Sequence, residues 1–154
     1  MPVDTPQGYD RTRRWGAWPE YTATWSSASN PQPAIGNGTV KAWARRDGSI
    51  GYVQFAITPG ATTTYGTGAW ALSLPSGWNA ASDTNRYQRG VLMLNDTGTA
   101  VYDGHCYVVP GGAAILLRYG SPWSNVQSNQ PFTWTNGDFL SGEITLALTD
   151  PTYP

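Results

Sequence analysis

The distribution of glycine and proline limits this chain to short elements of secondary structure. Its 154 residues include 18 glycines and 12 prolines, and only the stretches 20–30 and 78–89 run for ten or more residues without either. Both residue types are unfavourable inside a helix. The first stretch is rich in serine and threonine, and the apolar residues of the second form no stripe along one helix face. The sequence therefore predicts an all-β domain of short strands joined by many turns.

Residues 39–74 contain the clearest strand signals. Val40–Arg46 and Ile50–Thr58 are rich in residues that favour strands, and Asp47-Gly48 between them is a typical hairpin turn. Apolar side chains alternate along the second run, as expected of a strand with one buried face. A third alternating run, Trp70–Leu74, follows a connection rich in threonine and glycine.

The rest of the chain predicts further strands and two long loops. About eight strands divided between two sheets would form a jelly-roll-like antiparallel β-sandwich. The long loops are expected at 75–90 and 120–142, where exposed functional residues are most common. The remaining strands are expected at Tyr21–Trp25, Val91–Leu94, Thr99–Val109 with a bulge at Asp103-Gly104, Ala113–Tyr119 and Glu143–Thr149.

Composition argues against several classes of protein. Only 12% of the residues are charged and the formal net charge is −1, so the chain lacks the basic stripe that nucleic acid requires and the polybasic segment of a membrane anchor. No apolar run approaches the roughly 20 residues that span a bilayer, and residues 1–14 lack the apolar region of a signal peptide. A single cysteine excludes an intrachain disulfide framework and a cysteine-based zinc site.

The residues that could support catalysis or bind metal are poorly placed for either. His105 and Cys106 are adjacent in a predicted strand, so they should point to opposite faces, one to the core and one to the surface, and cannot act as a pair. Turn chemistry accounts for most of the carboxylates. The oxygen ligands around Asp83 and Asp96 do not match the spacing of a calcium-binding loop. We therefore predict a non-catalytic protein without a cofactor and assign no metal ligands, while the sequence leaves open a metal ion in the loops or on a symmetry axis.

Aromatic residues in the two polar loops are the best candidates for a binding site. An aromatic ring can stack on the C–H face of a sugar while neighbouring amides and carboxylates bind its hydroxyl groups. The alternative is that these rings cap the sandwich or fill a subunit interface. The tryptophans in predicted strands, Trp25, Trp43 and Trp70, are expected in the core or an interface. The candidate glycan-binding residues are Trp78, Asp83, Asn85, Tyr87, Trp123, Asn125 and Trp134.

An ordered series of short motifs carries a family resemblance. It covers about residues 20–149 and resembles a module common at the C-termini of minor tail proteins and tail fibres of long-tailed phages, especially those infecting actinobacteria. Tyr21–Trp25 is similar to the opening strand of that module, with Ala23 where proline is frequent. The other matching segments are Ala34–Val40, Trp43–Arg46, Val53–Phe55, Ala61–Gly68, Trp70–Pro75 and, more loosely, Pro131–Asp138.

The resemblance implies a function in host attachment. Residues 20–154 would be a head domain at the tail tip of a virion, assembled as a homotrimer and binding a host cell-wall or other surface polysaccharide. Residues 1–19 would be a connector or N-terminal arm leading to the rest of the fibre. The loops of such modules diverge, so the resemblance identifies no binding residues.

Three other functions remain open at the level of sequence. A structural virion protein, such as a capsid decoration or baseplate component, would need no host ligand. A glycan-degrading tailspike enzyme is disfavoured because the chain is short and has no repeats. A carbohydrate-binding module of a secreted enzyme is disfavoured by the missing signal peptide.

Overall fold

The computed structural model describes residues 18–149, and all regular secondary structure in that range is β-strand. All strand pairings within these residues are antiparallel, so the predicted all-β antiparallel fold is confirmed. The predicted connector 1–19 lies outside the described residues except for Trp18 and Pro19. The strands are β1 (Trp25–Ser29), β2 (Thr39–Asp47), β3 (Ile50–Thr58), β4 (Thr67–Ser73), β5 (Gln88–Asp96), β6 (Ala100–Val108), β7 (Ala114–Tyr119), β8 (Ser124–Asn125) and β9 (Phe139–Ala147).

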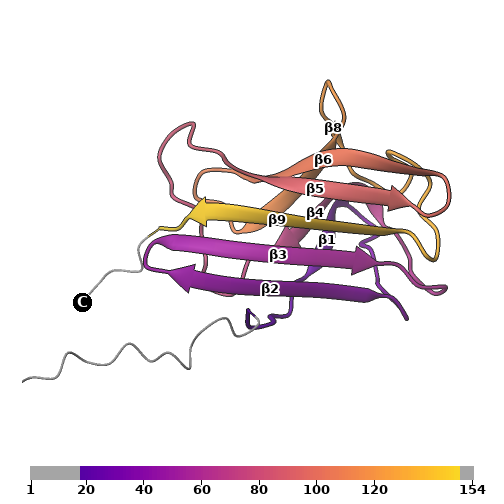
Figure 1. The fold of residues 1–154 in the computed structure, drawn as a ribbon, viewed down its shortest axis with the longest axis horizontal. Helices are drawn as coiled ribbons and strands as arrows, with labels where there is room; N and C mark the ends of the chain where they lie inside the picture. Colours follow the sequence, from indigo (N-terminus) through magenta and orange to yellow (C-terminus); the bar gives the residue numbers. More distant parts are fainter. Residues whose placement is uncertain (1–17, 150–154) are drawn as a thin grey trace, which may run out of the picture.

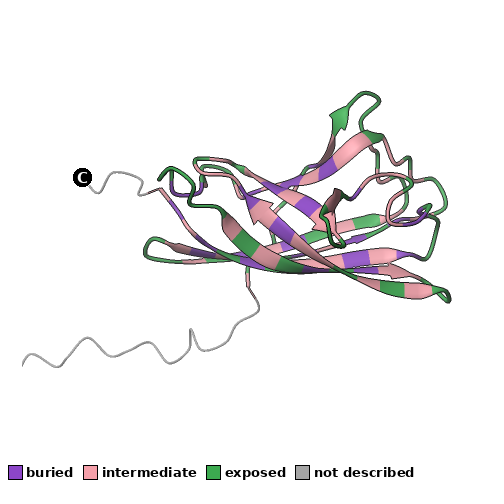
Figure 2. Ribbon diagram, turned by 90° about the horizontal axis from the view of Figure 1, so that it is seen from above, coloured by how far each residue is buried: buried purple, intermediate pink, exposed green. Residues whose placement is uncertain are grey.

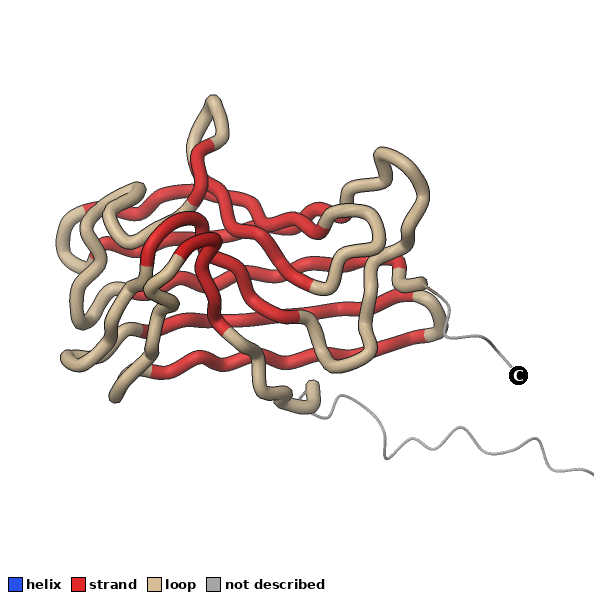
Figure 3. The backbone as a smooth tube through the Cα atoms, turned by 180° about the vertical axis from the view of Figure 1, so that it is seen from behind, coloured by secondary structure: helices blue, strands red, loops and turns tan. Residues whose placement is uncertain are grey.

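The strands form one sheet that curls on itself. Its order is β1-β4-β7-β6-β5-β9-β3-β2, with the two-residue β8 added to β7. The long strands β2, β3, β9, β5 and β6 form a front layer, and β1 and β4 pass behind it (Figure 1). The view from above shows the two layers, and buried residues occur along the strands of both (Figure 2). The hairpin of β7 and β8 projects from one side (Figures 1 and 3).

A single segment, residues 19–29, connects the two ends of this sheet; we call it the closing segment. The backbone of Pro19 and Tyr21 hydrogen-bonds to β2 at 3.0 and 2.9 Å. Further along, the nitrogen of Ser73 in β4 donates to the oxygen of Thr24 at 3.0 Å, and β1 then pairs with β4. Unpaired strand edges invite pairing with other chains. The closing segment covers part of one edge and supplies the strand at the other.

The core between the layers contains a cluster of aromatic rings. Trp70 is fully buried, and its ring centroid lies 4.8 Å from that of Trp25 and 5.1 Å from that of Trp134. Phe132 extends the cluster, with its centroid 4.4 Å from that of Trp134. The expectation that Trp25 and Trp70 pack in the core is confirmed, whereas Trp43 is half-buried on the outward face of β2.

Two strands extend through glycines that the sequence interpretation took as their ends. β5 contains Gly90, where an added Cβ would lie 2.1 Å from the oxygen of Glu143, and β9 contains Gly142, where it would lie 2.5 Å from Cζ of Phe55. A strand glycine often marks such a close approach. The predicted loops 75–90 and 120–142 were therefore too long, since β5 begins at residue 88 and β9 at residue 139.

Two other local predictions were wrong. The first strand begins at Trp25 instead of ending there. Tyr21 does not belong to this strand, because its backbone hydrogen-bonds to β2 at the opposite edge of the sheet. The bulge expected at Asp103-Gly104 is absent, since β5 and β6 pair without a register shift over their full length. The jelly-roll connectivity and the trimer stay predictions.

A buried carboxylate ties two turns together. Asp138 is 2% exposed, and its Oδ1 accepts a hydrogen bond from the nitrogen of Thr97 at 3.0 Å. Its Oδ2 accepts from the nitrogen and Oγ1 of Thr135 at 2.6 and 3.1 Å. Thr97 Oγ1 in turn donates to the oxygen of Gly137 at 2.6 Å. The segment 131–138, one of the resembling motifs, is thus anchored to the β5–β6 turn.

Candidate functional site

The register of the sheet brings three basic side chains together on its outward face. His105 on β6 pairs with Val91 of β5 on one side and with Arg118 of β7 on the other. Arg89 of β5 pairs with Tyr107, which lies two residues beyond His105 on the same face of β6. Arg89 and Arg118 therefore flank the central strand on which His105 and Tyr107 lie.

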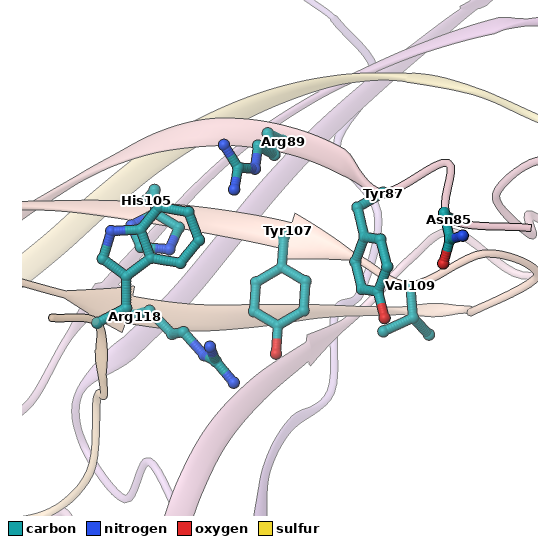
Figure 4. A pocket seen from close by; sticks show the side chains of 8 residues that line it. Asn85, Tyr87, Arg89, His105, Tyr107, Val109 and Arg118 are labelled. Atoms are coloured by element: carbon teal, nitrogen blue, oxygen red, sulfur yellow. The ribbon is translucent and has the colours of Figure 1, made fainter.

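These side chains line a hollow of about 530 Å³, within the size range of small-molecule sites. In Figure 4, Arg89 and Arg118 lie on opposite sides of His105 and Tyr107, and the hydroxyl groups of Tyr87 and Tyr107 point the same way. Strands β5, β6 and β7 contribute the floor, and the loops before β5, after β6 and after β7 contribute the rest. The lining residues are Asn85, Tyr87, Arg89, His105, Tyr107, Val109, Arg118 and Trp123.

Aromatic and cationic groups stack against one another inside the hollow. The Trp123 ring lies 3.9 Å from the His105 ring, and the guanidinium of Arg89 lies 4.5 Å from the centroid of Trp123. The guanidinium of Arg118 lies 5.0 Å from the centroid of Tyr107. Such contacts contribute about 0.5–1 kcal/mol each where they are exposed. They place the two guanidinium groups over aromatic rings.

The hollow is electrostatically positive. No carboxylate is among its lining residues, and neither Arg89 nor Arg118 forms a salt bridge with a described residue. Burial, together with the charges of Arg89 and then Arg118, lowers the pKa of His105 from its ordinary value of 6.5, so this imidazole is neutral at pH 7. The site therefore presents two uncompensated positive charges and one group that can still gain a proton.

Two buried nitrogen atoms in the hollow have no hydrogen-bond partner within residues 18–149. They are Nε2 of His105 and Nε of Arg118. Native structures contain few such atoms, and each one costs about 1–3 kcal/mol. An ordered water or a bound ligand would satisfy such an atom.

The structure brings three of the seven predicted binding residues into the hollow. These are Asn85 and Tyr87 from the first loop and Trp123 from the second; Tyr87 and Trp123 are 53% and 47% exposed. Asn125 of β8 pairs with Arg118 of β7 but does not line the hollow. Asp83 forms an exposed ion pair with Arg86 at 2.9 Å, outside the hollow.

The other two predicted residues pack against the protein itself. Trp134 is 2% exposed in the aromatic core, and its Nε1 donates to the oxygen of Gln130 at 3.3 Å. Its ring therefore offers no face to a surface ligand, and we remove it from the candidate site. Trp78 is half-buried over Gly51, where an added Cβ would lie 2.6 Å from the Trp78 ring.

The interpretation of the sequence missed the strand residues of the hollow. Arg89, His105, Tyr107 and Arg118 come from three strands, and their proximity depends on the order of those strands in the sheet. Alternation alone could have assigned each of them to the outward face. The expectation for the His105–Cys106 pair is confirmed, because Cys106 is fully buried while His105 lies on the outward face.

The described residues show neither a metal-binding cluster nor a transmembrane helix. Residues 18–149 hold no group of three or more histidine, cysteine, aspartate or glutamate side chains placed to bind one metal ion. No membrane-spanning helix occurs in the part of the chain that the structure describes.

Comparison with known proteins supports a phage tail-fibre kind of protein. Over 119 residues the chain is 30% identical to the Mu-like prophage FluMu defective tail fiber protein of Haemophilus influenzae. The aligned region covers 77% of this chain and 18% of that relative. No family model and no solved structure matches the chain. The similarity is therefore to a small part of a tail-fibre protein, and a place of this chain in a virion tail, the C-terminal head position and the link to actinobacterial phages stay predictions.

Proposed function

We propose that this chain is a receptor-binding part of a phage tail fibre that attaches the virion to a glycan on the host cell surface. The observation that carries the proposal is the pair of half-exposed rings, Tyr87 and Trp123, at the mouth of a hollow lined by hydrogen-bonding side chains. Half-exposed rings of this kind are costly to leave in water and are enriched where proteins bind partners.

The hollow suits a sugar in both shape and chemistry. A ring face of Trp123 or Tyr87 can cover the C–H face of a pyranose, and Asn85, Tyr107 and the arginines can hydrogen-bond its hydroxyl groups. The β7–β8 hairpin that carries Trp123 projects from the body of the domain (Figure 3), which would make the site accessible to an extended surface polysaccharide.

The fibre would attach through a head without catalytic activity at the tail tip. Residues 1–19 would connect this head to the rest of the fibre. A structural virion component without a host ligand is the alternative, and a glycan-degrading tailspike enzyme is a more distant one. Release of reducing ends from host polysaccharide by the purified chain would favour the enzyme over the proposal.

We further propose that the head is a homotrimer that associates through the outward face of the front layer. Val91 and Met93 of β5 and Val101 of the neighbouring β6 are 61%, 38% and 60% exposed there. An exposed apolar patch of neighbouring strands is typical of a protein interface. Sedimentation equilibrium should give a trimer, and Val101→Asp should shift it toward monomer. A monomer at all concentrations would overturn the trimer.

Binding to cells tests the main proposal. Fluorescently labelled protein should decorate at least one strain in a panel of actinobacterial and Haemophilus strains, and Trp123→Ala should weaken labelling about tenfold or more, a loss of about 1.4 kcal/mol. Trp78→Ala, whose ring lies outside the hollow, is the matched control, with Tyr52→Ala as a substitute if that variant does not fold. Equal labelling by the Trp123 and Trp78 variants would contradict this site, and failure to label any strain would contradict the function.

A further inference from the structure

Four arginines of the described chain, Arg45, Arg46, Arg89 and Arg118, form no ion pair with a described residue, and of these only Arg89 and Arg118 lie over aromatic rings. Lys41 is paired with Glu20 at 2.9 Å, and Arg86 is paired with Asp83 at the same distance. No carboxylate among residues 18–149 therefore neutralises the two arginines of the hollow by an ion pair.

The guanidinium groups of Arg89 and Arg118 lie over aromatic rings and form no ion pair with a described residue. A guanidinium donates its five N–H bonds in its own plane, and a planar fork of this kind matches a carboxylate or a phosphate. Arg89 and Arg118 come from strands on either side of β6, and because Arg89 is opposite Tyr107 and Arg118 is opposite His105, their backbones lie about 12 Å apart. A single acidic group above His105 and Tyr107 is within reach of both side chains.

We propose that the hollow recognises an acidic saccharide, a sugar that carries a carboxylate or a phosphate, with Arg89 and Arg118 binding the acidic group. The inference rests on the proposed function, because it specifies the chemical class of the glycan. Trp123 and Tyr87 would stack on the sugar ring, while Asn85 and Tyr107 would bind its hydroxyl groups. Nε of Arg118, which lacks a partner in the described chain, would gain one if an oxygen of the acidic group reaches it.

His105 gives this recognition a dependence on pH. The charged groups that face it are Arg89 from β5 and Arg118 from β7; Trp123 is uncharged, and Asp103 and Glu143 lie on the same face outside the hollow. Both arginines lower the pKa of His105. A bound anion offsets their charge, raises that pKa and favours uptake of a proton. Affinity should therefore increase as the pH falls from 7.5 to 5.5.

The experiment uses polysaccharide purified from a strain that the labelled chain decorates, in three forms. One is intact, one has its carboxylates reduced to alcohols, and one has its phosphodiesters removed with hydrofluoric acid. Loss of binding by about tenfold or more in one treated form is expected, and the form that loses binding identifies the acidic group. Undiminished binding to both treated forms would overturn the inference while leaving glycan binding intact.

Charge variants test the two arginines. Arg118→Gln and Arg89→Gln should each weaken binding to the intact polysaccharide about tenfold, as expected for one charge-assisted contact. Arg45→Gln, an exposed arginine on β2 outside the hollow, is the matched control. Equal binding by all three variants would also overturn the inference. If no purified polysaccharide binds the wild-type chain, the proposed function fails and the inference fails with it.

Discussion

Replacing Asp138 with asparagine should strongly destabilise the domain although the two side chains have nearly the same shape. The carboxylate accepts hydrogen bonds on both oxygens, from Thr97 through Oδ1 and from Thr135 through Oδ2. An amide has only one acceptor, so its NH₂ group must face at least one N–H donor. Hydrogen bonds to a charged group contribute about 1.5–3 kcal/mol each. Because one hydrogen bond is lost and the others no longer have a charged acceptor, the free energy of unfolding of the variant should fall by about 3 kcal/mol.

The measurement is urea and thermal unfolding at a fixed protein concentration. For a domain of this size, 3 kcal/mol corresponds to a fall in Tm of roughly 6–12 °C. Asp47→Asn is the matched control, because Asp47 is exposed at the end of β2, and its effect should stay within about 0.5 kcal/mol. A loss for Asp138→Asn no greater than that of Asp47→Asn would refute the argument that this carboxylate ties the two turns together.

Three further predictions concern the core. Gly90→Ala should lower the free energy of unfolding, measured in urea, by about 3 kcal/mol or more, because its methyl group would lie 2.1 Å from a backbone oxygen of β9. Gly77→Ala, in open space at a φ of 78°, should lower it by only about 1–2 kcal/mol. Equal losses would contradict the packing argument. Burial raises the pKa of Tyr21 to about 12, above its ordinary value of 10.0, so its contribution to stability is complete below pH 10 and lost as the pH rises toward 12. Tm should fall over that range, and less steeply in Tyr21→Phe; identical slopes would argue against this cause. Cys106 is fully buried and its pKa is raised to about 12 by burial, so a thiol reagent at pH 8 should modify it only when the domain unfolds, and rapid labelling of the folded chain would be inconsistent with the structure.

Strand patterns that depend on neighbouring residues in the sequence were predictable. Residues 40–58 form the expected hairpin because alternation and Asp47-Gly48 are both local signals. The extents of β5 and β9 were not predictable, because a glycine that ends a strand and a glycine that admits a neighbour are identical in sequence. Gly90 and Gly142 belong to the second kind, and only the adjacent strand reveals it.

The candidate site divides in the same way. Composition of the loops was enough to select Tyr87 and Trp123, but it selected Trp134 as well, and nothing in a sequence distinguishes a tryptophan that covers the surface from one that enters the core. Arg89 and Arg118 are 29 positions apart in the sequence. They line the same hollow only because their strands, β5 and β7, lie on either side of β6 in the sheet. The positive charge of the hollow therefore depends on the order of the strands in the sheet.

The closing segment gives the domain a defined response to tension. A pull from the N-terminal side reaches first the two backbone bonds that hold Pro19 and Tyr21 on β2, and only afterwards the pairing of β1 with β4. The free edge of β2 would therefore be uncovered while Trp25 still occupies the core. Under such a pull the domain would yield by a few residues at one margin before its interior is at risk.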